Sequence, residues 1–264
     1  MERSMLFFDI DGTLITEDDR RYLPDSARKA ICQARLHGHL VFINTGRVFI
    51  NVEPSIREIG FDGFVCGCGT YIHYNDRPLF HNHLSKELCD KTALLARECN
   101  IYSLFESADK NGVDRTLLSH PELARLCRRF QKLGREIREF VGDTDFSFDK
   151  FTSWYDTDSQ IERFKKEIQK DFDYIHRGDG FCEIVPKGFS KASGIDYLCE
   201  YFNIPLERCY AFGDSTNDLP MLLHVPNSIG MASGMKEVLD VVSYVTDSVE
   251  ENGIYRAMKH FALI

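Results

Sequence analysis

Two carboxylates lie one residue apart directly after an apolar run in "FFDIDGTLI", where they are Asp9 and Asp11. Side chains two apart on an extended strand point to the same side, so both could face one space. A second acidic turn, "GDSTND", follows another apolar run and carries Asp214, Asn217 and Asp218. Asp often caps turns, but two acidic turns that each follow a predicted strand are more than turn formation requires. The pattern therefore indicates a functional site.

Two other segments bring polar or basic residues to comparable positions. "INTGR" places Thr45, Gly46 and Arg47 after an apolar run, and Lys191 begins a predicted helix. Two like charges about 4 Å apart repel by about 4 kcal/mol at an effective dielectric of about 20, so four carboxylates cannot all ionise in one cleft without a cation. Oxygen ligands favour magnesium over zinc, and magnesium commonly also binds phosphate oxygens. Lys191, Arg47 and the metal would balance a phosphate of charge about −2.

The elements that must position these residues alternate as in an α/β protein. Helical spacing of alanine and isoleucine predicts a helix over residues 25–38, and the apolar run Leu40–Ile43 predicts a buried strand. A second helix is expected from Phe49 to about Ile59, before a short strand over residues 64–66. In a doubly wound parallel sheet the carboxyl ends of the strands form the ligand crevice. Turns that are far apart in the sequence can therefore meet there. We therefore predict a doubly wound parallel sheet.

The regular alternation of strands and helices is interrupted between about Leu84 and Val185. Helices around residues 87–99, 122–133 and 159–170 alternate with strand-like pieces, which are "IYSLF", "FSF", "FTSWY", "DYIHR" and "FCEIV". This mixture indicates an inserted α+β unit. Its aromatic residues are expected to form a core rather than a ligand site: Phe146, Phe148, Phe151, Trp154 and Tyr155. The α/β pattern resumes after Pro186 with a helix capped by Ser190. The predicted domains are a core, residues 1–83 and 186–264, and an inserted cap, residues 84–185.

Composition narrows the class of protein. A net charge of −9, from 32 basic and 41 acidic residues without a local basic block, argues against nucleic acid as a partner. The amino-terminal apolar run is too short for a signal peptide, and no window approaches the length of a membrane span. The nine cysteines contain no CxxC pair, which is typical of reduced thiols, so a cytoplasmic location is expected. "CGC" and "HNH" lack a matching second pair at zinc spacing, so zinc is not predicted.

The motifs "DIDGTL", "INTGR", "PKGFSKASGI" and "GDSTNDLPML" resemble, in order and approximate spacing, the four motifs of the haloacid dehalogenase (HAD) superfamily. The tail "IGMASGMKEVLDVVSYVTDSVEENGI" is similar to the Cof-type (subfamily IIB) phosphatases of that superfamily. The resemblance covers nearly the whole chain. It implies an HAD-like Rossmannoid core with an inserted cap.

The resemblance implies a role for each acidic residue. Asp9 would attack phosphorus and form an aspartyl phosphate, while Asp11 would protonate the leaving group and then activate water. Magnesium would be held by Asp9, the backbone carbonyl of Asp11 and Asp214, with Asp218 and Asn217 supporting the metal shell and the loop. General chemistry supports this division, because phosphoryl transfer depends chiefly on positioning and electrostatics.

The expected phosphate-binding set comprises Thr45, Gly46, Arg47, Lys191 and Asn217. Thr45 and Lys191 would grip the phosphoryl group, and Gly46 would let the backbone approach it. Arg47 could contact the substrate or pair with a carboxylate of the rim, and the sequence leaves both open. The chain departs from the family pattern in "CGCGT", where Cys68 stands in place of an expected Asn.

The function expected from these residues is a magnesium-dependent phosphatase of small phosphomonoesters, by resemblance sugar phosphates or related metabolites. The cap would close over the crevice and exclude bulk water. A phosphomutase that uses the same intermediate is one alternative, and a non-catalytic ligand-sensing protein on the same fold is another.

Overall fold

The computed structural model describes residues 2–140, 143–178 and 180–264. The chain forms two compact units. The core unit comprises Met1–Arg47, Asn51–Phe80 and Phe189–Ile264, and the inserted unit comprises Val48–Ile50 and His81–Gly188. Within the described residues, no helix is both long and apolar enough to span a membrane.

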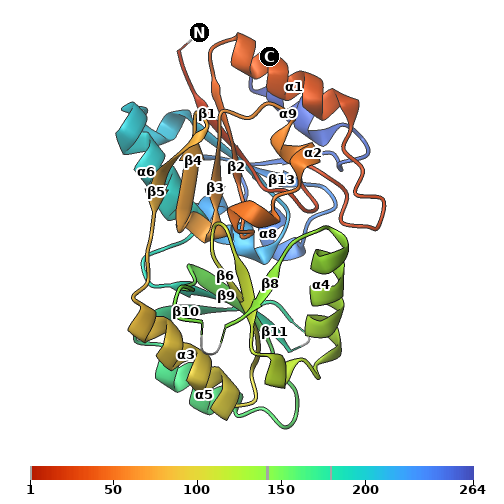
Figure 1. Cartoon of the computed structure of the whole chain (residues 1–264). Coiled ribbons are helices and arrows are strands. Elements are labelled where there is room, and N and C mark those ends of the chain that lie inside the picture. Colours follow the sequence, from red (N-terminus) through yellow and green to blue (C-terminus); the bar gives the residue numbers. More distant parts are fainter. Residues whose placement is uncertain (1, 141–142, 179) are drawn as a thin grey trace. The chain divides into compact units, whose positions relative to one another are not determined.

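The core unit is built on an eight-stranded sheet in the order β14-β13-β12-β1-β2-β3-β4-β5 (Figure 1). The pairs from β14 to β3 are parallel, and β4 runs antiparallel to β3. The predicted doubly wound α/β fold is therefore confirmed. The strands are β1 Met5–Phe8, β2 Leu40–Asn44, β3 Gly63–Cys66, β4 Tyr71–Tyr74, β5 Arg77–His81, β12 Cys209–Gly213, β13 Asn227–Met231 and β14 Tyr244–Thr246.

Helices accompany the strands of the core unit. They are α1 Asp25–Leu36, α2 Pro54–Arg57, α6 Lys191–Phe202, α7 Leu219–His224, α8 Lys236–Leu239 and α9 Gly253–His260. Short 3-10 turns are η1 Phe49–Asn51, whose first two residues belong to the inserted unit, η2 Gly67–Gly69, η4 Leu206–Arg208 and η5 Thr216–Asp218. The chain passes from β1 to β2 on one side, whereas β12 pairs with β1 on the other, so strand order reverses between β1 and β12. Ligands bind at such a switch point in open α/β sheets.

The central strands are buried along their whole length, as expected for a parallel sheet covered on both faces. Phe7 of β1 stacks on Phe42 of β2 with ring centroids 5.5 Å apart, and both rings are fully buried. On α6, Ile195 and Leu198 pack into the same apolar cluster. Ser190 caps α6 by accepting hydrogen bonds from the amides of residues 192 and 193, as predicted. β1 and β12 are thereby held in the middle of the sheet within a buried apolar core.

The inserted unit contains a six-stranded sheet in the order β10-β11-β9-β6-β7-β8, antiparallel except for the β7–β8 pair. Helices α3 and α5 lie side by side (Figure 1) and contribute to one apolar cluster, while α4 packs in another with Leu104 and Val113. The elements are α3 Lys86–Glu98, β6 Tyr102–Glu106, β7 Asn111–Val113, η3 Arg115–Leu117, α4 Pro121–Lys132, β8 Ile137–Glu139, β9 Lys150–Trp154, α5 Ile161–Ile168, β10 Phe172–His176 and β11 Phe181–Pro186.

Aromatic side chains fill the core of the inserted unit. The rings of Phe105 and Phe148 stack with centroids 5.0 Å apart, and Phe148 meets Phe151 at 5.3 Å. Phe146, Phe148 and Phe151 are fully buried, and Trp154 is partly buried against the cluster that contains α4. The expectation that these residues form a core is confirmed.

Two expected elements are wrong in detail. No continuous helix spans residues 49–59, because Pro54 holds the preceding Glu53 in an extended conformation between η1 and α2. "FSF" is not a strand. Its alternating buried rings imitate one, but they belong to a loop in which Phe146 covers Gly112 of β7; a Cβ on that glycine would lie 2.0 Å from the ring.

Candidate active site

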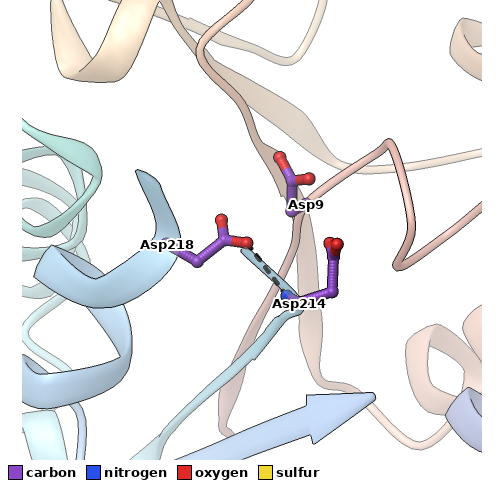
Figure 2. A group of neighbouring side chains, drawn as sticks. All are labelled: Asp9, Asp214 and Asp218. Atoms are coloured by element: carbon purple, nitrogen blue, oxygen red, sulfur yellow. Dashed lines mark hydrogen bonds between the residues drawn. The ribbon is translucent and has the colours of Figure 1, made fainter. Parts of the chain in front are cut away.

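Three carboxylates from separate segments meet at the carboxyl edge of the core sheet. Asp9 follows β1, Asp214 follows the adjacent strand β12, and Asp218 ends the turn η5. One carboxylate oxygen from each lies within 4.8 Å of the others, and all three residues are buried. Figure 2 shows the three side chains converging from these segments. The backbone amide of Asp9 donates to the carbonyl of Phe212 at 3.0 Å, so sheet pairing itself sets the two strand ends side by side.

Asp218 is held from two directions. Its Oδ2 accepts hydrogen bonds from the backbone amides of Asp214 at 3.0 Å and Ser215 at 3.1 Å, the first of which is dashed in Figure 2. Its Oδ1 accepts from Lys191 Nζ at 2.5 Å. The capping box of η5 is formed by Ser215 and Asp218. Asp218 therefore shapes the turn that carries Asp214.

Lys191 is a buried cation between two of these carboxylates. Its Nζ lies 2.6 Å from Asp9 Oδ1 and 2.5 Å from Asp218 Oδ1, and the residue is 1% exposed. Burial alone would lower the pKa of the lysine, but Asp218 and Asp9 raise it overall. An ammonium group fixed in this way stays charged and could contact a further anion.

Gly12 and Thr13 fit the first acidic turn to Asp214. Gly12 has φ +76°, and a Cβ at this position would lie 2.3 Å from Asp214 Oδ2. Only glycine combines this backbone conformation with such a close approach. Thr13 Oγ1 donates to Asp214 Oδ1 at 2.9 Å. Thr13 was not among the predicted site residues, although it lies in the first motif.

Crowding of buried carboxylates shifts their titration. Burial raises the pKa of Asp9 to about 7; Lys191 opposes this shift, whereas Asp218 adds to it. Burial, followed by the charges of Asp9 and Asp218, raises the pKa of Asp214 to about 8. Both carboxyl groups therefore keep their protons to higher pH than exposed aspartates do, and Asp214 does so more than Asp9. Ionising them together requires a positive charge beside Asp214.

Asp11 does not join this group and instead lies in a ring of alternating charges. Arg47 binds it through two nitrogens, Nε at 2.9 Å from Oδ2 and Nη2 at 2.6 Å from Oδ1. Arg21 Nη1 lies 3.1 Å from Asp11 Oδ1, and Glu53 contacts both arginines. Burial would raise the pKa of Asp11, but Arg47 and then Arg21 lower it overall. Arg21 and Glu53 were missed because they lie outside the recognisable motifs.

Other predicted residues surround the carboxylate group. Thr45 is buried, and its Oγ1 accepts a hydrogen bond from the backbone amide of Arg47 at 3.2 Å, within the turn that also contains Gly46. Asn217 Oδ1 accepts from Ser215 Oγ at 2.7 Å and so belongs to the η5 turn. Cys68 adopts φ 55°, a left-handed conformation that Asn tolerates better than most residues. The expected Asn therefore has a backbone reason as well as a polar one.

Open space adjoins Asp214 within the core unit. A cavity of about 210 Å³ is lined by Gly12, Thr16, Asp214 and Ser233, among others. Two further carboxylates, Glu17 and Glu250, border it. Asp214 therefore borders open space and is not enclosed by protein on every side.

The fold and the carboxylate group define a class of protein, the phosphoryl-transfer hydrolases with a Rossmann-like core, and comparisons identify the family. The model of the haloacid dehalogenase-like hydrolases matches residues 6–258. The chain belongs to this family. It is a Cof-type hydrolase of subclass IIB and a phosphatase.

Individual relatives agree with that assignment. YkrA of Bacillus subtilis, provisionally named a phosphatase, is 27% identical over 264 residues and covers 100% of both chains. A Bacillus subtilis protein named 5-amino-6-(5-phospho-D-ribitylamino)uracil phosphatase, YitU, is 21% identical over 97% of each chain. The solved structure of BT4131, described as an HAD subclass IIB sugar phosphatase, has a TM-score of 0.80 and 26% identity, covering 99% of this chain and 100% of that one.

Proposed function

We propose that the chain is a Mg²⁺-dependent phosphatase that hydrolyses small phosphomonoesters, sugar phosphates or related metabolites, through an aspartyl phosphate on Asp9. The observation that carries the proposal is the meeting of Asp9, Asp214 and Asp218 within 4.8 Å, with Lys191 against two of them. A nucleophilic carboxylate, a cation site and a phosphate-binding ammonium group are thereby gathered at one sheet edge.

The donor chemistry of the site fits magnesium. Every member of the carboxylate group offers oxygen, which a hard cation prefers. Burial, with neighbouring carboxylates adding to it, raises the pKa of Asp9 to about 7 and that of Asp214 to about 8, so a bound cation would favour the ionised form of both. We propose that Asp9, Asp214 and the backbone carbonyl of Asp11 hold the ion, with Asp218 in support. When bound, magnesium neutralises charge on the carboxylates and on the phosphoryl oxygens.

Asp9 is the proposed nucleophile. Lys191 holds its Oδ1 at 2.6 Å and keeps the carboxylate oriented. The Asp9 oxygen that attacks forms a bond to phosphorus while the ester oxygen leaves, and water then cleaves the aspartyl phosphate to release inorganic phosphate. Lys191 and Thr45 are proposed to bind phosphoryl oxygens, with Gly46 and Asn217 shaping the turns around them. Lys191 is already charged and immobile, so it needs no reorganisation during reaction.

Arg47 links substrate binding to the release of Asp11. An acid that protonates the leaving group must carry a proton, yet Arg47 and Arg21 lower the pKa of Asp11. We propose that the incoming phosphate competes for Arg47, so that Asp11 loses its partner and can take up a proton. In the second step Asp11 acts as the base that activates water. Both alternatives expected for Arg47 then describe successive states of one residue.

The substrate class rests on similarity. The printed names of relatives include a sugar phosphatase and a phosphatase of a phosphoribityl compound, both of which act on small phosphorylated molecules. We propose the same class for this chain, with residues 84–185 as a cap that selects the leaving group. The cytoplasmic location expected from the cysteines stays a prediction.

The test is a panel of phosphorylated metabolites and one aryl phosphate, assayed for released inorganic phosphate with Mg²⁺ and with a chelator. Turnover should require the metal. Asp9→Asn should abolish it while the fold survives, and Asp11→Asn should accumulate phosphorylated Asp9, detected by mass spectrometry. Turnover of Asp9→Asn near the wild-type rate would refute the nucleophile. Phosphate that moves to a second sugar hydroxyl instead of solution would identify a mutase, and no reaction with any compound would favour a ligand-sensing protein.

A further inference from the structure

Two cysteine sulfur atoms meet in the core unit, and the proposed phosphatase chemistry uses neither. Cys199 lies on α6, Cys209 begins β12, and their Sγ atoms are 3.4 Å apart. Cys209 is fully buried, whereas Cys199 is partly exposed. The pair therefore combines a partly exposed cysteine with a fully buried one.

The environment of the pair favours a reactive Cys199. The Sγ atoms lie within hydrogen-bond distance, and a hydrogen bond from the Cys209 thiol lowers the pKa of Cys199 despite partial burial. The same contact, followed by burial, raises the pKa of Cys209. Elsewhere in the core unit, burial raises the pKa of the Cys66 thiol, which makes it inert. A thiolate is the reactive form of cysteine, so Cys199 is the attacking member and Cys209 the resolving one.

We propose that Cys199 and Cys209 form an oxidation site that reacts with hydroperoxides and closes to an intramolecular disulfide. The Cys199 thiolate attacks the peroxide, the O–O bond breaks, and Cys199 becomes a sulfenic acid while the departing oxygen takes a proton. The sulfur of Cys209 then attacks that of Cys199, the S–O bond breaks, and the hydroxyl group leaves as water with the Cys209 proton. Two thiols are oxidised and one hydroperoxide is reduced.

The local geometry permits closure with little movement. A disulfide needs its sulfur atoms about 2.05 Å apart, so the present separation of 3.4 Å must shrink by roughly 1.4 Å. The two cysteines are joined by a short connection through Asn203 and η4, so no distant segments must be brought together. The bond would tether α6, which begins at Lys191, to β12, which precedes Asp214. Oxidation would thus restrain two elements that carry the phosphatase site.

Mass spectrometry tests the proposal directly, because trypsin cleaves after Arg208 and separates the two cysteines. The reduced full chain is treated with hydrogen peroxide, free thiols are alkylated, and the digest is searched for peptides 192–208 and 209–236 joined by a disulfide. We expect this linked species to appear, to vanish after reduction with dithiothreitol, and to raise the thermal midpoint of the oxidised chain.

Single variants separate a paired site from general thiol oxidation. Cys199→Ser should prevent the linkage, and Cys209→Ser should leave a sulfenic acid on Cys199 that dimedone labels. Cys32→Ser is the matched control, because Cys32 is exposed on α1 and should not be required. The proposal is overturned if the folded chain oxidises at Cys32 while peptides 192–208 and 209–236 stay unlinked, or if Cys199 pairs with another cysteine. Neither result depends on phosphatase activity, so failure here leaves the proposed function standing.

Discussion

Replacing Asp214 by Asn tests the claim that the carboxylates of Asp9, Asp214 and Asp218 destabilise the folded chain when they are ionised together, and that a bound cation removes this cost. The pKa of Asp214 is raised from 3.8 to about 8 by burial and by neighbouring carboxylates. Asn keeps the shape, and its Oδ1 can still accept the hydrogen bond that Thr13 Oγ1 donates at 2.9 Å. The substitution therefore removes the ionisable group while it preserves the packing of the turn.

The sign and size of the effect follow from proton linkage. Between about pH 4 and pH 8 the folded chain keeps a proton on Asp214 that the unfolded chain has lost. The stability that this proton gives to the folded chain is fully present below the unfolded pKa of 3.8. It is lost as the pH rises to the folded pKa of about 8. Each pH unit in this window costs about 1.4 kcal/mol, so the metal-free wild type should lose about 4 kcal/mol from this residue between about pH 5 and pH 8. The Asp214→Asn variant should not show this pH-dependent loss of stability, because it has no ionisable group at position 214.

Hydrogen exchange of peptides from β1 and β12 measures the free energy of opening in the core unit, independently of the inserted unit. The chelator-treated wild type and Asp214→Asn should agree near pH 4, where Asp214 is protonated in the folded chain and still partly protonated in the unfolded chain, and the variant should be several kcal/mol more protected near pH 8. Added Mg²⁺ should stabilise the wild type near pH 8 and leave the variant unchanged. Equal pH slopes for the two metal-free proteins would refute the reasoning, because Asp214 would then titrate like an exposed carboxylate.

Three other substitutions test separate parts of the structure. Gly12→Ala should lower the free energy of unfolding by at least about 1–2 kcal/mol, because φ is +76° and the new Cβ would lie 2.3 Å from Asp214 Oδ2. Urea denaturation measures the loss of stability, and Mg²⁺ titration measures any loss of metal binding. A variant with unaltered stability and Mg²⁺ binding would contradict this prediction. Glu53→Gln removes one of the two carboxylates that Arg47 binds, so Arg47 should hold Asp11 more strongly. If the ion pair contributes about 1 kcal/mol, kcat/KM should fall about fivefold. An unchanged or higher kcat/KM would argue against competition between the substrate phosphate and Asp11 for Arg47. Phe146→Ala should destabilise the inserted unit by about 3–5 kcal/mol, measured by unfolding followed through tryptophan fluorescence, whereas a cost below about 1 kcal/mol would show that the loop repacks.

The core sheet could be predicted because its signals are local and redundant. The apolar runs that became β1, β2 and β12 are buried on both faces, so no alternation is needed to recognise them. The turns after β1 and β12 could be expected to meet because parallel strands share one carboxyl edge. The convergence of Asp9 and Asp214 thus followed from sequence pattern and topology together.

What the sequence could not give depends on tertiary contacts. β7 and β8 are three residues each, too short for a period to appear, and Phe146 imitates a strand residue while it lies in a loop over Gly112. The ring of Asp11, Arg47, Glu53 and Arg21 joins four positions that no motif links. Such pairing is decided by where the turns come to lie, so it becomes visible only in three dimensions.

The three carboxylates near Lys191 differ in the contacts that they make, which indicates a different role for each. Lys191 occupies Asp9 Oδ1 and Asp218 Oδ1, and backbone amides occupy Asp218 Oδ2, so Asp218 is committed to the lysine and the turn. Asp214 accepts from Thr13 and borders open space. With all three carboxylates ionised, one lysine leaves two negative charges uncompensated, and a phosphate dianion would be repelled. A divalent ion on the Asp9 and Asp214 side would therefore have to bind before or together with the substrate.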